Sequence, residues 1–188
     1  MRSLLCALLL FSNYACANVI EHPATISYYI VNHHTGQSLA AALDNATTIE
    51  RDGKKFRGKV KWNIKWNIRW YSTADRCELT NITVDAFSTV TLPKLISDDA
   101  RAKAYFANFL NALRIHEAGH VRNGINAAYE IESVVKKNLP RQNCDLLKSD
   151  VDRIAFNIIK KYELLDIQYD KETEHGKTQG AWINPELI

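Results

Sequence analysis

The chain has 188 residues, of which 46% are hydrophobic and 24% are charged, and its formal net charge at pH 7 is +3. This composition excludes a disordered chain, a collagen-like fibre and a low-complexity tract, and it favours a globular protein. No Lys/Arg block of the kind that follows a phosphate backbone is present, so we expect no nucleic-acid partner.

The first residues are typical of an export signal. An apolar run from Leu4 to Phe11 follows Arg2 and is too short to span a bilayer. Ala15-Cys16-Ala17 is a small-x-small site of the kind that signal peptidase cleaves. We therefore predict a signal peptide over 1–17, a periplasmic or secreted location, and no stable membrane insertion after cleavage.

Cleavage of this signal decides which cysteines remain. Cys6 and Cys16 leave with the signal, and the mature chain keeps only Cys77 and Cys144. An even pair of cysteines in an oxidising compartment predicts one disulfide bond between them.

The first part of the mature chain has strand and turn patterns. Thr25 to Val31 is rich in Ile and Tyr and predicts a strand, which a short helix over Leu39 to Leu43 follows. Asp52-Gly53 predicts a hairpin turn. In residues 59–70 every second residue is apolar, a period of two that only an extended strand presents. The apolar positions are Val60, Trp62, Ile64, Trp66, Ile68 and Trp70.

Further strand is predicted over 77–87 and 88–92, where the alternation slips between Leu79 and Ile82 as it does at a β-bulge. The period becomes helical after Leu92-Pro93.

Helical spacing begins at about Ala100 and continues to Leu139-Pro140, with a bend expected near Gly119 or Gly124. A last helix is predicted over Cys144 to Leu165, followed by a turn-rich tail from residue 166. These patterns predict one α+β domain over 18–188, in which a mainly antiparallel N-terminal sheet packs against C-terminal helices.

The second half contains an HExxH motif, His116-Glu117-Ala118-Gly119-His120. Four residues are slightly more than one helical turn, so both imidazoles lie on one face and can bind one metal ion. Glu117 can act as general base on a metal-activated water, the chemistry of peptide-bond hydrolysis. Imidazole ligands favour Zn²⁺ as the cofactor. The alternative is an exposed helix face without a ligand.

A catalytic zinc needs a third protein ligand. The metzincin pattern is excluded, because Asn123 and Asn126 occupy its downstream glycine and histidine positions. We favour His175, which lies in a polar segment after the motif, as the third ligand. Asp170 is the reserve, and Glu163 is the ligand that a gluzincin arrangement would use.

A resemblance to a known family rests on several of these features. It is carried by the alternating Trp strand, Cys77, Leu92-Pro93, His116 to His120, Cys144, Tyr169-Asp170, Thr173, His175-Gly176 and Gln179-Gly180. Between Tyr28 and Trp182 the chain resembles the bacterial DUF922 family, described as secreted zinc-dependent proteases. The resemblance implies a zincin-like metallopeptidase with a functional Tyr-Asp-x-x-Thr-x-His-Gly tail.

We therefore expect an exported zinc metallopeptidase acting on a peptide or protein substrate. Tyr169 or Tyr162 is a candidate donor to the oxyanion of the tetrahedral intermediate. Two alternatives remain open from the sequence. One is a zinc amidase that acts on cell-wall peptides, and the other is a non-catalytic periplasmic module that binds a metal or a partner.

Overall fold

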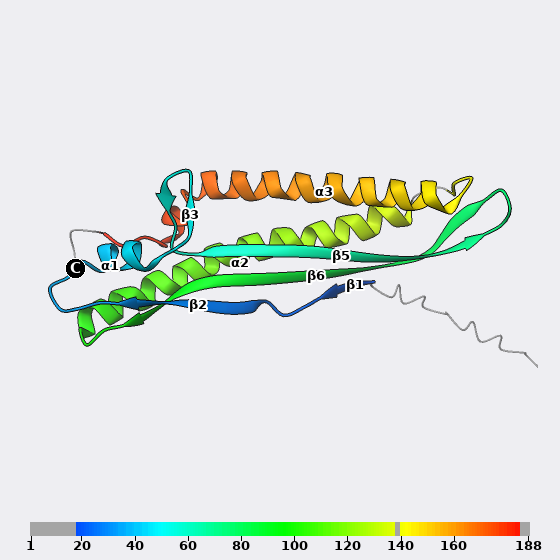
Figure 1. The fold of residues 1–188 in the computed structure, drawn as a ribbon. Helices are drawn as coiled ribbons and strands as arrows, with labels where there is room; N and C mark the ends of the chain where they lie inside the picture. Colours follow the sequence, from blue (N-terminus) through cyan, green and yellow to red (C-terminus); the bar gives the residue numbers. More distant parts are fainter. Residues whose placement is uncertain (1–17, 138–139, 185–188) are drawn as a thin grey trace, which may run out of the picture.

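The computed structural model describes residues 18–137 and 140–184, so the predicted signal peptide over 1–17 lies outside the described residues. Two long strands and two long helices run along an elongated molecule (Figure 1). In chain order the elements are β1 (Val19–Glu21), β2 (Thr25–Asn32), α1 (Leu39–Ala46), β3 (Glu50–Arg51), β4 (Lys54–Lys55), β5 (Lys59–Ser72), β6 (Cys77–Ile96), α2 (Ala100–Lys136), α3 (Cys144–Glu172) and the 3-10 helix η1 (Lys177–Gln179). The α+β class predicted from the sequence is confirmed.

The main sheet is built around β6. β5 pairs with β6 in antiparallel orientation along one edge, whereas β1 and β2 both pair with it in parallel along the other. Two of the three pairings are thus parallel, and a mainly antiparallel sheet is not confirmed. Alternation in a sequence reveals that a strand exists and which face is apolar, but it carries no information about the direction of the partner strand.

The long hairpin of β5 and β6 contains the bulge expected from the sequence. Arg69 is opposite Asn81 and Trp70 is opposite Leu79, so one additional residue of β6 lies between them. β6 also continues through Pro93, where the sequence suggested that strand structure ends. Proline has no backbone N–H to donate and is therefore confined to strand positions that lack one partner. Pro93 is such a position, because β5 begins opposite Thr91 and leaves Pro93 paired with β2 alone.

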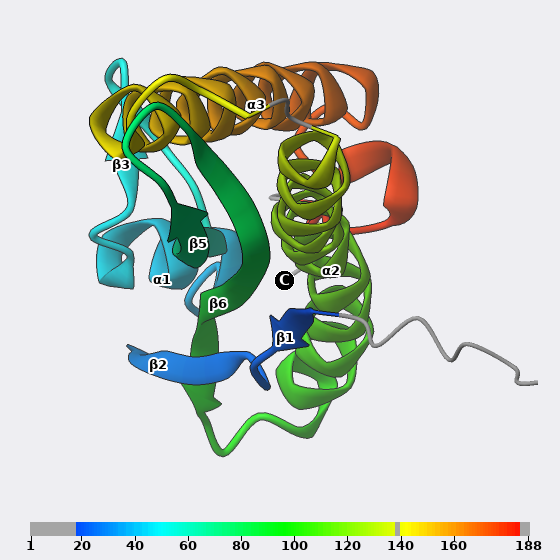
Figure 2. The same ribbon diagram turned by 90° about the vertical axis from the view of Figure 1, so that its right-hand side faces the viewer.

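The helix α2 covers one face of the sheet, while α1 lies on the other face (Figure 2). One core cluster joins the C-terminal half of α2 to the long strands and α3, and includes Ile64, Ile82, Val84, Ala127, Ile131, Val135, Val151 and Ala155. A second cluster joins α1 and the N-terminal half of α2 to β2 and β6, and includes Val31, Leu39, Leu43, Leu92, Phe106, Phe109 and Leu113. The sheet and α2 therefore form one continuous framework for the residues described below.

The helix α2 is continuous from Ala100 to Lys136, so the glycines near which a bend was expected do not divide it into two helices. Both glycines permit close packing instead. A Cβ atom at Gly124 would lie 2.7 Å from the Cβ of Trp62, and one at Gly119 would lie 2.4 Å from the Cζ of Tyr169. The absence of a side chain lets α3 and β5 approach the helix at these two points.

The predicted end of α3 near Leu165 is also wrong, because the helix continues to Glu172. The polar composition of residues 166–172 suggested a turn. In the structure the carboxylates of Asp166 and Asp170, one helical turn apart, contact the histidines of α2. Polar residues in this segment thus mark a helix face directed at a polar site.

The predicted disulfide bond is confirmed. Cys77 at the start of β6 is bonded to Cys144 at the start of α3, with 5.1 Å between their Cα atoms. Backbone hydrogen bonds between Cys77 and Arg141 hold the same junction, at 2.7 and 2.9 Å. A disulfide is compatible with an oxidising compartment outside the cytosol. In the described part of the chain, no helix combines the length and apolarity needed to cross a bilayer.

Candidate metal centre

The HExxH residues lie in the middle of α2 and face α3. His116 and Glu117 are each 4% exposed and His120 is 9% exposed. α3 runs antiparallel to α2, so its last turns lie opposite this part of the helix (Figure 1). Buried polar side chains require partners, and α3 supplies them with two carboxylates, Asp166 and Asp170.

Three side chains converge on one point. The Nε2 atoms of His116 and His120 lie 3.3 and 3.1 Å from the same atom, Oδ1 of Asp170. Within the described residues, these three side chains form a group whose ligand atoms all lie within 4.8 Å of one another. Two ligands at about 2.0–2.1 Å from a tetrahedral zinc ion are themselves about 3.3 Å apart, so the spacing and the donor types fit zinc.

The second nitrogen of each imidazole is held by a partner outside this group. Nδ1 of His116 lies 3.0 Å from Oε1 of Gln179, and Nδ1 of His120 lies 2.9 Å from Oδ1 of Asp166. Both partners accept hydrogen bonds, so Nδ1 donates in each case, and Nε2, which is directed at Asp170, is the nitrogen that a metal ion would bind. Asp166 is fixed in turn by the Trp62 indole at 2.7 Å and the Asn123 amide at 2.7 Å.

The electrostatics of the group favour a bound cation. Burial raises the pKa of Asp170, but hydrogen bonds from His116 and His120 outweigh this effect and hold the pKa below its usual range. Burial lowers the pKa of His120, whereas hydrogen bonds to Asp166 and Asp170 raise it more strongly, to about 9. Positive charge is therefore stabilised between these side chains, the position that a divalent metal ion would take.

Glu117 lies beside the group without belonging to it. Burial raises the pKa of its carboxyl group to about 7. The backbone just before β5 contributes to this burial. It passes so close to Glu117 that a Cβ atom built at Gly58 would lie 2.1 Å from Oε1 of Glu117. A carboxyl group whose pKa is near neutral can both accept and return a proton, as a general base and acid must.

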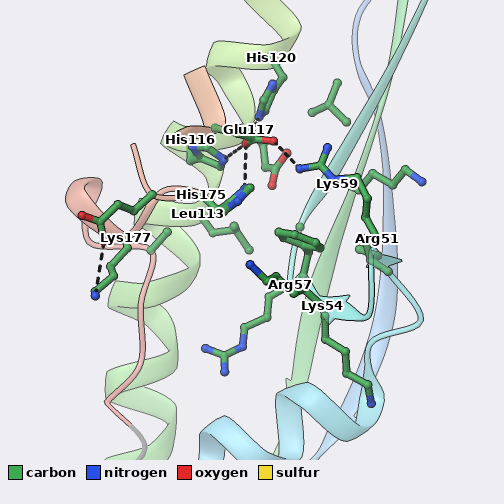
Figure 3. Close-up of a pocket in the computed structure, with 18 of the residues that line it drawn as sticks. Arg51, Lys54, Arg57, Lys59, Leu113, His116, Glu117, His120, His175 and Lys177 are labelled. Atoms are coloured by element: carbon green, nitrogen blue, oxygen red, sulfur yellow. Dashed lines mark hydrogen bonds and ion pairs between the residues drawn. The ribbon is translucent and has the colours of Figure 1, made fainter. Parts of the chain in front are cut away.

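A pocket of about 1260 Å³ opens over the group. The side chains of His116, Glu117 and His120 line it from α2, and Figure 3 shows His175 beside them. The opposite wall comes from the segment between α1 and β5, including Arg51, Lys54, Arg57 and Lys59. The candidate metal centre is thus accessible to a ligand larger than water.

Comparison of the sequence with models of known protein families identifies one match. The DUF922 family, described as a bacterial protein of unknown function, matches residues 26–176. The chain belongs to the DUF922 family. No curated protein and no solved structure matches it. The matched range includes the HExxH helix and the last turns of α3, so the DUF922 region contains all three converging side chains.

The predicted third ligand, His175, lies at the edge of the centre of this DUF922 protein. Its Nδ1 is 3.5 Å from Oδ1 of Asp170, and its side chain is 42% exposed. Asp170, the predicted reserve, is instead the third member of the converging group, while Glu163 lines the pocket outside that group. A ligand role for His175 stays a prediction.

The chain reverses sharply around His175. Glu174, His175 and Gly176 have φ angles of 48°, 54° and 84°. A Cβ atom at Gly176 would lie 2.9 Å from Cγ of His116, so this glycine allows the turn to pack directly on α2. The His175 and Phe56 rings make an edge-type contact, with 4.8 Å between ring centroids.

Tyr169, the predicted oxyanion donor, packs against α2. Its ring stacks on His116 at 5.1 Å, and its hydroxyl donates to the backbone oxygen of His116 at 3.2 Å while accepting from Nε2 of Gln179 at 3.0 Å. These contacts give Tyr169 a positioning role toward His116. Tyr162, the other candidate, donates to Glu130 at 3.0 Å. Stabilisation of an oxyanion by either residue stays a prediction.

Sequence reasoning assigned no role to three residues that complete the candidate centre, namely Asp166, Gln179 and Gly58. Asp166 could have been found from its spacing to Asp170, because residues four apart on a helix share a face. Gln179 was noticed only as part of the family resemblance. No local signal distinguishes Gly58, whose contact with Glu117 depends on how β5 approaches α2.

Proposed function

We propose that this DUF922 protein is an exported zinc metallopeptidase with a zincin-like arrangement of its site. One observation carries the proposal: His116 and His120 direct their Nε2 atoms at one carboxylate oxygen of Asp170, with the buried Glu117 adjacent to them. We assign the ligand role to these three side chains. The disulfide between Cys77 and Cys144 supports a periplasmic or secreted location.

The residues of the chain have separate tasks in this proposal. When bound, zinc polarises the scissile carbonyl and lowers the pKa of water. Glu117 accepts the proton from the attacking water and returns it to the leaving amine. Asp166 and Gln179 keep the two imidazoles in the orientation and protonation state that metal binding requires.

A peptide can be held beside the first residues of β5. In the described residues β5 pairs with β6 alone, and Lys59 to Trp62 line the pocket. An extended peptide that adds to such a strand places its backbone in a fixed register, and Gly58 brings that strand next to Glu117. This arrangement supports a peptide as the substrate.

Removal of the metal tests the proposal. The mature protein, incubated with an unfolded protein substrate, is expected to cleave it, to lose this activity after treatment with a chelator, and to recover it when zinc is added. Cleavage that a chelator leaves unchanged would contradict the proposal. Zinc binding without hydrolysis of any peptide would favour a binding module, and activity on purified sacculi alone would favour a cell-wall amidase.

Replacement of Gly58 by alanine tests the position of Glu117. The added methyl group would overlap the carboxylate, so Glu117 must move, and displacement of a catalytic group by about 1 Å can lower kcat by about 10²-fold. Zinc content is expected to stay at the wild-type value, because the three ligands are untouched. Unchanged hydrolysis with normal folding would refute the assigned position.

A further inference from the structure

The wall of the pocket opposite the metal centre is strongly basic. Six of the eleven residues in 51–61 are lysine or arginine, against one acid, Asp52. All six line the pocket: Arg51, Lys54, Lys55, Arg57, Lys59 and Lys61. The bases are spaced among other residues, so they form no block in the sequence, but the hairpin of β3 and β4 and the start of β5 bring them to one pocket. Figure 3 shows four of them, Arg51, Lys54, Arg57 and Lys59.

Part of this charge is compensated within the protein. Arg57 forms an ion pair with Asp44 at 2.9 Å, and Arg51 forms one with Asp170 at 3.2 Å. Lys55 donates to the backbone oxygen of Asp44 at 2.6 Å. On the rim of the same pocket Lys177 pairs with Glu174 at 3.5 Å.

Two lysines of β5 face the pocket without such a partner. Among the described residues, neither Lys59 nor Lys61 forms an ion pair, and both lie opposite uncharged residues of β6, Thr91 and Thr89. The remaining acids on the pocket lining away from the metal centre are Glu50 of β3 and Glu163 of α3. The wall therefore presents uncompensated positive charge where a peptide would lie.

The spacing of the two lysines matches that of an extended peptide. Residues two apart on a strand point to the same face and are about 7 Å apart, and the alternate side chains of an added strand have the same repeat. Opposite charges that face each other across two strands stabilise their pairing. A peptide in register with β5 would thus place alternate side chains opposite Lys59 and Lys61.

We propose that the site selects acidic peptides, bound in extended form along the start of β5 with Asp or Glu at alternate positions opposite Lys59 and Lys61. The identification of this ligand as the substrate rests on the proposed function. Binding itself depends only on the basic wall and the strand, and it can be measured without hydrolysis.

The test uses the full mature chain carrying Glu117→Gln, so that bound peptide is not cleaved. The probes are two fluorescein-labelled octapeptides, one with Glu and one with Gln at alternate positions, followed by fluorescence anisotropy. We expect the Glu peptide to bind about tenfold more tightly, since two exposed ion pairs contribute about this much in total, and to lose this advantage at high salt. Lys59→Glu combined with Lys61→Glu should abolish the preference.

A matched control lies on the same face of β5. Lys65 is outside the pocket lining and lies opposite Asp85, so Lys65→Glu should leave the preference for the Glu peptide unchanged. Equal affinity for both peptides would overturn the inference. So would a Lys65→Glu variant that loses the preference for the Glu peptide as fully as the Lys59 and Lys61 variant does. Equally tight binding of a non-peptide polyanion, tested with an oligonucleotide of the same charge, would also overturn it.

The two proposals fail in different ways. If the Glu peptide binds selectively but the wild-type protein never cleaves it, the proposed hydrolytic function is wrong and the acidic-peptide site stands. If the wild-type protein cleaves neutral peptides and the Lys59 and Lys61 substitutions change nothing, the metallopeptidase stands and the inferred selectivity is wrong.

Discussion

Replacing Glu117 with glutamine is expected to lower peptide hydrolysis by about 10³-fold while the protein keeps its zinc. Glutamine has nearly the same shape but cannot accept a proton from water. The buried position tolerates a neutral amide, because burial already disfavours the charged carboxylate and raises its pKa to about 7. The measurement is kcat/KM on a fluorogenic peptide, together with zinc content by elemental analysis.

Glu163→Gln is the matched control for this prediction. Glu163 is a carboxylate of α3 that lines the same pocket but lies outside the converging group. The assigned mechanism predicts that this variant retains most of its activity. Retained activity in Glu117→Gln, or an equal loss in both variants, would show that Glu117 is not the general base.

Removal of the disulfide bond is expected to lower the free energy of unfolding by about 4 kcal/mol, because the bond closes a long loop in the unfolded chain. Cys77 and Cys144 are separated by 67 residues, and the bond ties the start of β6 to the start of α3. The variant Cys77→Ala/Cys144→Ala, compared with the wild type by urea unfolding, measures this effect. A loss below about 1 kcal/mol would contradict it.

The same double-cysteine variant should lose stability while its folded form keeps the ability to bind zinc. The disulfide is at the N-terminal end of α3, whereas Asp170 is 26 positions further along, a rise of about 39 Å along a helix. We therefore expect the folded part of the variant population to bind zinc as the wild type does. Wild-type protein treated with a reductant should show the same loss of stability, which excludes an effect of the alanine side chains.

The features that could be predicted from the sequence are those with a strong period or a defined spacing. Strict alternation predicted β5, and the interrupted alternation located the bulge near Leu79. The HExxH spacing placed His116 and His120 on one helix face, and the structure confirms this placement. These signals are local, so they need no knowledge of the tertiary partners.

The predictions that were wrong concern features that depend on tertiary contacts. Gly119 suggested a bend, yet its lack of a side chain serves the contact with Tyr169. The segment from 166 looked like a turn because it is polar, yet its carboxylates contact the histidines of α2. Extension of α3 through this segment brings Asp170 into the candidate metal centre. The sequence alone, in which this segment looked like a turn, favoured His175 instead.

Zinc content of the mature protein and of three alanine variants tests the assigned ligand set. We expect about one zinc ion per wild-type chain, loss of zinc in His120→Ala and in Asp170→Ala, and retention in His175→Ala, whose side chain lies at the edge of the group. Retention of zinc in Asp170→Ala together with its loss in His175→Ala would contradict the assigned ligand set. A wild-type protein that binds no zinc after reconstitution would contradict the metal centre itself.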